Sequence, residues 1–373
     1  MPEPAAVLIA AVSGRSLAAS ARRAGLVPLV ADCFGDDDTL ALARAHVRLR
    51  SRAARGIDPE ELLPALERLA APHSPLGIVY GTGFEDRPKL LGRIARRWRL
   101  LGNTPETIVR LKHPGSFAAL CRDCGVAHPQ TRVDRPADMA GWVAKRAGGA
   151  GGTHVRSLID REAGRGTTYY QRRVSGSPVS ALVLGNGRGA IVLGFSAQWA
   201  SPGEGRPFRY GGAVRPAMLS SGLSAALTSA VERLASTVPL VGLNSFDFLV
   251  EDDAFRLLEI NPRPGGTLDI FEPGGGSLFG LHVASCGGAL PERAANLPGA
   301  AAACIVYAHR DVRSVPAMDW PAWAADRQRA ASSVGSGDPF CTVSARAPTA
   351  AAAAELVKQR AAAVLAMLDA RLK

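Results

Sequence analysis

The chain has 373 residues, of which 47% are hydrophobic and 21% are charged. This length predicts two or three domains, and the composition is typical of a globular protein with an apolar core, which excludes a disordered tail. Forty glycines and 26 prolines indicate many turns and at least one glycine-rich loop. Their share stays below the roughly 25–30% of low-complexity sequences, so fibrous and collagen-like classes are also excluded.

Basic residues outnumber acidic ones, with 44 Lys and Arg against 33 Asp and Glu and a formal net charge of +11. An excess of this size makes nucleic acid a candidate partner. The most suggestive stretch, residues 93–99, holds four arginines and Trp98, but its spacing is also that of the exposed face of an ordinary helix. An anionic small substrate suits the same charge, and we favour it over nucleic acid.

Neither a signal peptide nor a membrane span is predicted. Glu3 stands where a signal peptide would carry a base, and the apolar run 5–12 is far shorter than the roughly 20 residues that cross a bilayer. Six cysteines are too sparse for a disulfide scaffold, which favours a reducing cytoplasm. Cys121 and Cys124 lack the further ligands of a zinc site, and Cys341 lies in an apolar strand, so we expect structural roles for them.

The first part of the chain is predicted to be an α/β domain. The predicted elements are buried strands at 6–12, 26–32 and 77–80, and a helix from about residue 16 to Gly25. An acid ends the second strand, and the loop 81–85 follows the third. Strands that alternate with helices and end in polar residues indicate a doubly wound sheet. The turn at 13–16 lacks the glycines of a dinucleotide fingerprint.

The sequence pattern changes at about residue 103. We predict a helix that begins at 103–106, a second helix at 115–124, strands at 304–307 and 340–343, and a final alanine-rich helix at 350–372. We therefore divide the chain into an α/β domain at 1–102, a central module at 103–290 and a C-terminal α+β segment at 291–373. The central module is divided further into subdomains at about 103–170 and 171–290.

The strongest chemical signal is a pair of strands at 246–250 and 255–261, which an acidic turn joins into a predicted hairpin. Side chains alternate across a strand, so Glu259 and Asn261 face the same side, and Asp247 on the neighbouring strand can lie beside them. Three oxygen ligands on one face suit Mg²⁺, with Mn²⁺ as an alternative. A solvent-facing polar stripe on an edge hairpin is the competing interpretation.

The run 262–266, Pro-Arg-Pro-Gly-Gly, follows the hairpin directly and is not typical surface sequence. The planar guanidinium of Arg263 suits a developing phosphoryl or carboxylate charge. The amides of Gly265 and Gly266 are suited to hold an oxyanion. These residues therefore favour the metal interpretation of the hairpin.

A second signal is Lys145 near the end of a predicted strand, followed by the glycine-rich loop 148–153. Such a lysine and the loop amides can hold phosphates. The loop is not a Walker A motif, because the lysine precedes the glycines. Alone the loop is weak evidence, but together with a metal hairpin about 100 residues later it predicts a nucleotide site.

In chain order, Lys112, Lys145 with its loop, the segment 170–176, Asp247 and the segment 259–263 resemble the signature of the ATP-grasp superfamily. The resemblance covers about residues 103–290, and the preceding residues look like the domain that usually precedes such a module. It implies a Rossmann-like N-terminal domain, a two-subdomain ATP-grasp module and a small C-terminal α+β segment.

The resemblance also implies roles for individual residues, with ATP and Mg²⁺ as cofactors. The implied nucleotide-binding residues are Lys112, Lys145, Gly149, Gly151, Gly152, Gln171, Arg172 and Val174. The implied metal ligands are Asp247, Glu259 and Asn261, and the implied catalytic residues are Lys145 and Arg263. Residues 171–174 are implied to form the linker that holds adenine. An acid that often follows this linker is missing from 171–180, so the ribose contact is unassigned.

Three loops, at 81–85, 208–212 and 337–343, look like those of ATP-grasp proteins described as biotin-carboxylase-related carboligases. These include tyramine–glutamate ligase-like enzymes of methanofuran-type and tetrahydromethanopterin-linked one-carbon cofactor biosynthesis. The implied function is a carboxylate–amine ligase that forms an acyl phosphate and releases ADP and phosphate. An ATP-dependent carboxylase and a non-catalytic nucleotide-binding module are the alternatives.

The second substrate is expected to contact Arg15, Glu85, Arg209 and Gly265, by analogy with where this architecture holds it. The expected partners are thus a small-molecule acid and an amine, without a membrane partner. The C-terminal segment is a candidate surface for a homodimer.

Overall fold

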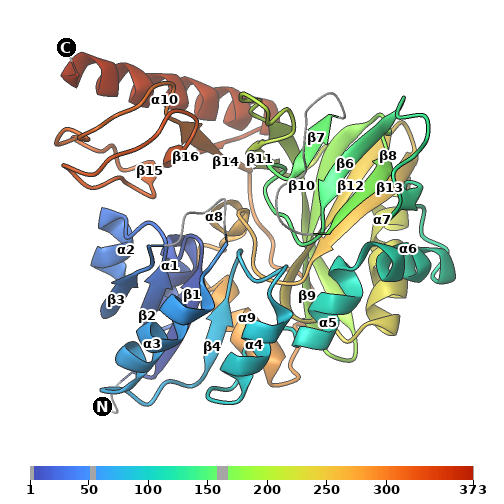
Figure 1. The fold of residues 1–373 in the computed structure, drawn as a ribbon, viewed down its shortest axis with the longest axis horizontal. Helices are drawn as coiled ribbons and strands as arrows, with labels where there is room; N and C mark the ends of the chain where they lie inside the picture. The colour runs from blue at the N-terminus through green and yellow to red at the C-terminus, as the bar shows by residue number, and fades with distance from the viewer. Residues whose placement is uncertain (1–3, 51–55, 158–166, 373) are drawn as a thin grey trace.

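A computed structural model describes residues 4–50, 56–157 and 167–372. Figure 1 shows the N-terminal part in blue, the C-terminal segment in red above it, and the central strands and helices in green to yellow beside both. Residues 1–3, which bear on the predicted absence of a signal peptide, lie outside the described residues. Of the helices described, none is long and apolar enough to cross a membrane.

The N-terminal part is built on a parallel sheet with the strand order β3-β2-β1-β4. Its elements are β1 (Ala6–Ala11), α1 (Arg15–Arg23), β2 (Val27–Asp32), α2 (Asp37–Leu42), β3 (Ala45–Arg48), α3 (Pro59–Ala70), β4 (Ile78–Tyr80) and α4 (Pro88–Ala95). The predicted strands and first helix are confirmed, and β1 is buried along its whole length, as a central parallel strand should be. Because the strands are parallel, the loops after β1, β2 and β4 leave the same edge.

Two helices and a small antiparallel sheet follow. They are α5 (Pro105–Lys112), α6 (Pro114–Asp123), β5 (Thr131–Arg132), β6 (Trp142–Arg146), β7 (Val155–Ser157) and β8 (Thr168–Arg172), and the strand order is β5-β8-β6-β7. Thr104 caps α5 by accepting a hydrogen bond from the Thr107 amide at 3.4 Å, with Pro105 in the first turn. Both predicted helices are therefore found, and α5 ends at Lys112 because its chain turns there to begin α6.

The largest sheet of the described residues has the order β13-β12-β9-β10-β11-β14-β16-β15 and is antiparallel throughout. Its elements and the attached helices are β9 (Ser177–Asn186), β10 (Ala190–Ala200), β11 (Tyr210–Arg215), α7 (Ser221–Thr237), β12 (Val241–Glu251), β13 (Ala254–Asn261), α8 (Leu268–Phe271), α9 (Leu278–Cys286), β14 (Ala300–Tyr307), β15 (Ala324–Ala325), β16 (Pro339–Ala347) and α10 (Ala350–Arg371). The predicted hairpin is β12–β13, at one edge. The predicted C-terminal strands are β14 and β16, and they extend the same sheet through β11.

Hydrophobic clusters hold these parts together. On one face of the large sheet, Leu227 of α7 and Phe246 of β12 share a buried cluster, whereas Phe279 of α9 belongs to the cluster on the other face. That second cluster also contains Ile9 of β1, so α9 joins the N-terminal sheet to the large sheet. Helix α10 covers β14 and β16 through Val357. The edge of the N-terminal sheet, the glycine loop and the large sheet thereby surround one cavity.

Candidate active site

Strands β12 and β13 bring the three predicted metal ligands together. Asp247 pairs with Glu259 across the hairpin, and the Asn261 amide donates to Asp247 Oδ2 at 2.9 Å and to Glu259 Oε1 at 3.3 Å. On the neighbouring strand β9, Ser180 donates its hydroxyl to Asp247 Oδ1 at 2.6 Å. Asp247, Glu259 and Asn261, the hairpin cluster, thus share one face as the alternation predicted.

Lys112, the last residue of α5, covers the hairpin cluster with its ammonium. Its Nζ donates to Asn261 Oδ1 at 2.7 Å and lies 3.3 Å from Glu259 Oε2. The lysine side chain is 7% exposed, and a buried ammonium requires acidic partners of this kind. A lysine predicted to bind phosphate is therefore held beside the predicted metal ligands.

The two carboxylates of the hairpin cluster differ in their protonation. Burial, reinforced by the charge of Glu259, raises the pKa of Asp247 to about 6. Burial acts in the same direction on Glu259, but the ammonium of Lys112 and other nearby positive groups outweigh it and hold the pKa of Glu259 well below its usual range. The charge of Glu259 contributes to the raised pKa of Asp247, and a divalent cation held by both carboxylates would offset this repulsion.

The donor set of the hairpin cluster fits Mg²⁺. Within the described ranges, no three His, Cys, Asp or Glu side chains converge in a way that could hold a metal ion. A metal at the hairpin therefore relies on the Asn261 amide beside two carboxylates, an all-oxygen set that suits a hard cation which keeps waters and phosphate oxygens as further ligands.

Lys145 lies in the small sheet, on β6, where it is almost fully buried. Its Nζ donates to Gln171 Oε1 of the adjacent strand β8 at 2.9 Å, and the Gln171 amide donates to Thr131 at 3.3 Å. Burial lowers the pKa of Lys145, although the nearby Glu259 acts against that shift. Lys145, which is predicted to bind phosphate, is thus hydrogen-bonded to Gln171, which is predicted to contact adenine.

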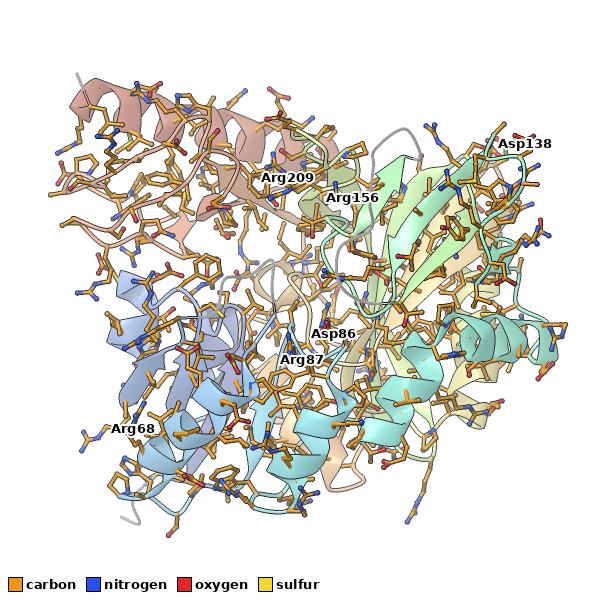
Figure 2. The ribbon with its side chains drawn as sticks, in the orientation of Figure 1. Arg68, Asp86, Arg87, Asp138, Arg156 and Arg209 are labelled. Carbon is orange, nitrogen blue, oxygen red and sulfur yellow. The ribbon has the colours of Figure 1, made fainter. Side chains whose placement is uncertain are left out.

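The glycine loop between β6 and β7 contacts both walls of the cavity. A Cβ on Gly148 would lie 2.7 Å from the backbone of Asp86, in the loop that follows β4. A Cβ on Gly152, which has φ +69°, would lie 1.8 Å from the carbonyl oxygen of Phe208. Figure 2 shows Asp86 on the side of the N-terminal part and Arg156, just after the loop, on the opposite side. Only glycine permits these two approaches.

His154, in the same loop, is a site residue that the sequence did not reveal. Its ring packs against Gly149, where a Cβ would lie 2.1 Å from the His154 Cγ. Burial lowers the pKa of His154 to about 4 despite the nearby Glu259, so the ring is neutral near pH 7. Its buried Nδ1 has no hydrogen-bond partner among the described residues. Its position next to a glycine loop was the one available signal.

The predicted adenine linker lines the cavity at Arg172 and Val174. The Arg172 guanidinium lies 5.4 Å from the centre of the Trp142 ring and donates to the carbonyl of Ala140 at 2.9 Å. Val174 and Leu258 supply apolar lining in the same region, which suits a planar base. The role of the linker in binding adenine stays a prediction.

Arg263 is held by Glu85, which the sequence had placed among the substrate contacts. The Arg263 Nε donates to Glu85 Oε1 at 2.8 Å, and the other Glu85 oxygen accepts the amides of Gly83 and Phe84. Both side chains are nearly fully buried. Burial alone raises the pKa of Glu85, but the Arg263 charge outweighs it and lowers that pKa. Glu85 therefore positions Arg263, and a Cβ at Gly265 would lie 3.1 Å from the same guanidinium.

Arg209 is engaged with the protein itself. Its guanidinium lies 3.6 Å from the centre of the Tyr307 ring and donates to the carbonyls of Ser201 at 2.8 Å and Gly337 at 2.9 Å. These bonds join the loop after β10 to the segment before β16. Its predicted contact with substrate stays a prediction. In the structure, Arg209 lines the cavity and is held by the two carbonyls (Figure 2).

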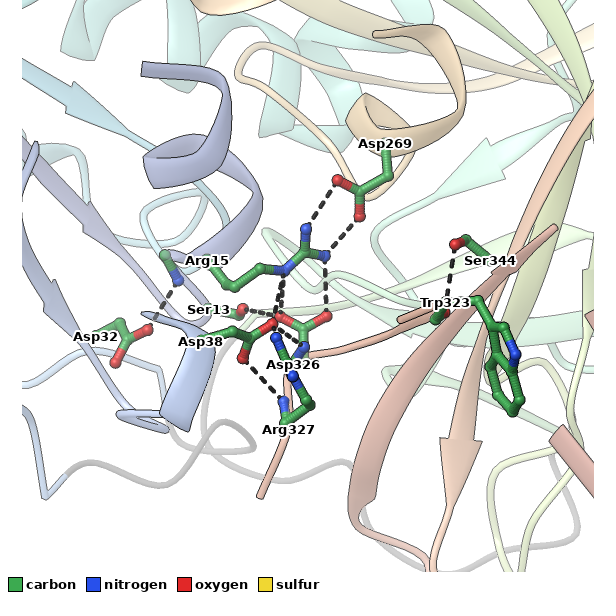
Figure 3. Close-up of polar contacts among 10 residues, drawn as sticks. Ser13, Arg15, Asp32, Asp38, Asp269, Trp323, Asp326, Arg327 and Ser344 are labelled. Atoms are coloured by element: carbon green, nitrogen blue, oxygen red, sulfur yellow. Dashed lines mark hydrogen bonds and ion pairs between the residues drawn. The ribbon is translucent and has the colours of Figure 1, made fainter. Parts of the chain in front are cut away.

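Arg15 lies between two acids that come from distant parts of the chain. It donates to both oxygens of Asp269, at 2.8 and 2.5 Å, and to both oxygens of Asp326, at 3.1 Å each. Figure 3 shows the guanidinium between these two carboxylates, with Ser13 and Asp38 beside them. Among the predicted substrate contacts, Arg15 is thus surrounded by acids that could not be placed there from the sequence.

One cavity of about 1210 Å³ joins these groups. The predicted site residues that line it are Arg15, Glu85, Lys145, Gly151, Gly152, Gln171, Arg172, Val174, Arg209, Asp247, Glu259, Asn261, Arg263 and Gly265. Lys112 and Gly149 line a small recess that shares Glu259 and Gln171 with it. The cavity therefore extends from the hairpin cluster past Arg263 to Arg15.

Comparison with known proteins identifies the fold. Residues 117–267 match the family model of the ATP-grasp domain. The carbamoyl phosphate synthase large chain of Deinococcus deserti is 26% identical over 224 residues, which are 52% of this chain and 21% of that protein. This chain thus spans about a fifth of the length of that relative.

Similar solved structures cover nearly the whole chain. Biotin carboxylase from Campylobacter jejuni, in a β,γ-ATP complex, matches with a TM-score of 0.71 at 16% identity, over 94% of this chain and 89% of that chain. N5-carboxyaminoimidazole synthetase from Staphylococcus aureus, complexed with ADP, matches with a TM-score of 0.67 at 14% identity, over 96% and 97%. The chain contains an ATP-grasp domain and has the mixed α/β ATP-grasp fold, which confirms the resemblance seen in the sequence.

Proposed function

We propose that this chain is an ATP- and Mg²⁺-dependent carboxylate–amine ligase that works through an acyl phosphate. The observation that carries the proposal is the cavity with its adjoining small recess, which together bring Lys112, Lys145, the hairpin cluster and Arg263 beside the loops of the N-terminal sheet. Phosphoryl transfer requires positioning and charge neutralisation rather than a side-chain nucleophile. This set of residues supplies both.

Each residue has a defined task under this proposal. Lys112 and Lys145 bind phosphate oxygens of ATP, exchanging their present protein partners for them. Asp247, Glu259 and Asn261 hold Mg²⁺, which when bound neutralises phosphate charge and orients the phosphates. Arg263, held by Glu85, stabilises the charge on the transferred group with its planar fork.

The proposed reaction balances in two steps. A carboxylate oxygen of the acid forms a bond to the γ-phosphorus of ATP, and the bond from that phosphorus to the β,γ-bridging oxygen breaks to release ADP. A neutral amine then attacks the acyl carbon, the bond between that carbon and the phosphate oxygen breaks, and the amine loses a proton. The products are an amide, ADP and phosphate. Water must be kept from the acyl phosphate, and the glycine loop between the two cavity walls is placed for that task.

An ATP-dependent carboxylase is the second candidate, because the fold matches biotin carboxylase over nearly its whole length. In that reaction bicarbonate is the acid and the same phosphate-binding residues serve. The two candidates therefore differ in the acid that the cavity accepts. The cavity volume of about 1210 Å³, with Arg15 and Glu85 of the N-terminal part in its lining, favours an organic acid and amine.

A turnover screen tests the proposal. Purified protein is incubated with ATP and MgCl₂ and a panel of organic acids or bicarbonate, with and without amines, while ADP, AMP, phosphate and pyrophosphate are measured in parallel. The proposal expects equal amounts of ADP and phosphate only when an organic acid and an amine are both present. AMP and pyrophosphate would exclude the acyl phosphate, turnover with bicarbonate alone would establish the carboxylase, and ATP binding without turnover would indicate a non-catalytic module.

We also propose where the enzyme acts, on which compounds, and in which oligomeric state. Six free cysteines in the described residues are consistent with action in a reducing cytoplasm. The loops that suggested a one-carbon cofactor pathway, 81–85, 208–212 and 337–343, contribute residues to the cavity, which supports acids and amines of that pathway as the first compounds to screen. A homodimer is proposed on the model of a biotin carboxylase domain described as a dimer, and light scattering tests it.

A further inference from the structure

A group of carboxylates lines the cavity at the end away from the hairpin cluster. We call Asp36, Asp269 and Asp326 the acidic recess. They come from the residue before α2, from α8 and from the segment after β15, and all three line the cavity. Arg15 donates two hydrogen bonds to Asp269 and two to Asp326, at distances between 2.5 and 3.1 Å.

The acids that surround the acidic recess are already engaged. Asp32, at the end of β2, accepts the amides of Gly14 and Gly35 at 2.9 Å each and faces the His46 ring at 3.0 Å. Asp38 accepts the amides of residues 326 and 327. Asp38 Oδ2 also lies 3.9 Å from the guanidinium nitrogens of Arg15 and Arg327. Together these contacts fix the shape of the acidic recess.

Asp36 differs from its neighbours because its carboxylate has no partner. The residue is only 2% exposed, and within residues 4–50, 56–157 and 167–372 no donor or cation lies within bonding distance of its side chain. Burial and the negative charges of Asp326, Asp32 and Asp38 raise the pKa of Asp36 to about 9, against the single opposing charge of Arg15. A buried carboxylate in this position lacks a positive charge, and the cavity that it lines is the place from which one can come.

We propose that the acidic recess binds a primary ammonium group of a substrate, with Asp36 as its principal partner. The identity of the ammonium carrier as a substrate rests on the proposed ligase function, whereas its binding does not require turnover. A compact ammonium with three donors fits one free carboxylate beside two that Arg15 already engages. With Asp269 and Asp326 engaged by Arg15, the recess offers one free carboxylate, which is fewer oxygen ligands than a divalent cation takes, so an organic cation is favoured over a metal.

The ammonium in the acidic recess is not the reacting group. An amine must be neutral to attack an acyl phosphate, whereas a group held by carboxylates stays protonated. The substrate therefore carries this ammonium in addition to its reacting end, which would lie near Arg263 in the same cavity. Either a diamine, whose other nitrogen reacts, or an amino acid, whose carboxylate is activated, has this chemistry.

Calorimetric titration of three small probes tests the inference on the full chain. The probes are 1,5-diaminopentane, 5-aminopentanoate and 1-pentanol, and the proteins are wild type, Asp36→Asn and the control Asp37→Asn, which alters the exposed neighbour in the first turn of α2. We expect at least one ammonium probe to bind wild type and D37N at least tenfold more tightly than D36N, with 1-pentanol alike in all three. Tight binding of the diamine would indicate that the amine substrate carries the ammonium. Tight binding of 5-aminopentanoate would indicate that the acid substrate carries it.

Proton release supplies a second readout that a merely structural role would not produce. Asp36 is protonated in the free protein near neutral pH, and an ammonium partner favours its charged form. The affinity of the ammonium probe should rise by up to about tenfold per pH unit between pH 7 and 9, while the probe itself stays protonated. The D36N variant should lose this dependence, and its thermal melting verifies that it is folded.

The outcomes separate this inference from the proposed function. Binding of neither ammonium probe to wild type, or equal binding to wild type and D36N, overturns the acidic recess as an ammonium site even if ligase turnover is found. Asp36-dependent binding without turnover in the screen supports the recess and removes the ligase.

Discussion

The cavity has two carboxylate groups at its two ends, and they are neutralised in different ways. At the hairpin cluster, the ammonium of Lys112 bonds to Asn261 and pairs with Glu259. In the acidic recess, Arg15 engages Asp269 and Asp326, whereas the Asp36 side chain has no hydrogen-bond or ion-pair partner in the part of the chain that the structure describes. The first end holds movable lysine charges that phosphates and a metal can rearrange. The second end holds a fixed deficit of positive charge.

This difference indicates what each end binds. A site for an anionic nucleotide and its cation needs both signs of charge, and the hairpin cluster with its lysines has both. A site with excess carboxylate needs only a cation. The Arg263–Glu85 pair lies between them, buried and internally neutral, as expected for a group that acts on the transferred charge rather than on either ligand alone.

The largest effect is expected at the hairpin cluster. Replacement of Glu259 by Gln removes one of two carboxylates from the proposed metal site while it keeps the shape of the side chain, so turnover should fall by about 1000-fold. The rate of ADP release at saturating MgCl₂ measures it. The control E251Q alters an exposed acid at the end of β12 and should be neutral. Near-normal turnover of E259Q would remove the metal assignment.

The pair between the two ends is tested by Glu85→Gln. This change leaves the buried Arg263 without its carboxylate, and breaking a buried pair in this way costs about 3–5 kcal/mol of stability. Urea unfolding of E85Q measures the loss. We also expect a lower kcat in the folded variant, since Arg263 loses its orientation. A stability change below about 1 kcal/mol would show that Glu85 does not hold Arg263.

The nucleotide end is tested by Lys145→Ala. A hydrogen bond to a charged group contributes about 1.5–3 kcal/mol, so the Kd for ATP should rise by about 10- to 100-fold. Equilibrium binding of a fluorescent ATP analogue measures the change. Lys358→Ala, on the exposed side of α10, serves as the control. Unchanged affinity of K145A would move the phosphate site elsewhere in the cavity.

The hairpin cluster also predicts a pH dependence. The pKa of Asp247, raised to about 6 by burial and Glu259, means that this group takes up a proton as the pH falls through 6. Turnover should then drop by up to about tenfold per pH unit, and more MgCl₂ should shift the drop to lower pH because the metal competes with the proton. A pH profile that is flat from 5 to 8 at limiting MgCl₂ would contradict the role of Asp247.

The smallest effect is expected at an exposed ion pair outside the cavity. The pair of Arg93 and Glu60 joins α4 to α3 at 2.9 Å, but both side chains are exposed. Exposed pairs contribute about 0–1 kcal/mol, so Glu60→Gln should change stability by less than about 1 kcal/mol and leave turnover unchanged. Parallel urea unfolding and ADP assays provide this baseline, and a larger loss would mean that the arginine-rich helix has more than a surface role.

The sequence was sufficient where the chemistry lies on one local segment. The hairpin, the shared face of Asp247 and Glu259, and the start of the helix at 103–106 all follow from strand alternation and capping within short stretches. The confirmed ATP-grasp domain also follows from residues in a fixed chain order.

The acidic recess could not be predicted from the sequence. Asp36 follows β2 closely, but Asp269 and Asp326 come to it from more than 200 residues away, through the packing of α8 against α1 and the pairing of β15 with β16. The same limit applies to the ion pair of Glu85, whose contact with substrate, expected by analogy with the architecture, stays a prediction. Its partner Arg263 is 178 residues distant in the chain.

Transfer of oxygen from the acid to phosphate tests the central claim most directly. The acid found in the turnover screen is labelled with ¹⁸O in both carboxylate oxygens, and the phosphate released with ADP is analysed by mass spectrometry. An acyl phosphate requires one ¹⁸O in each phosphate, because the carboxylate oxygen that bonds to phosphorus leaves with it. Unlabelled phosphate, or label recovered in AMP, would contradict the proposed ligase.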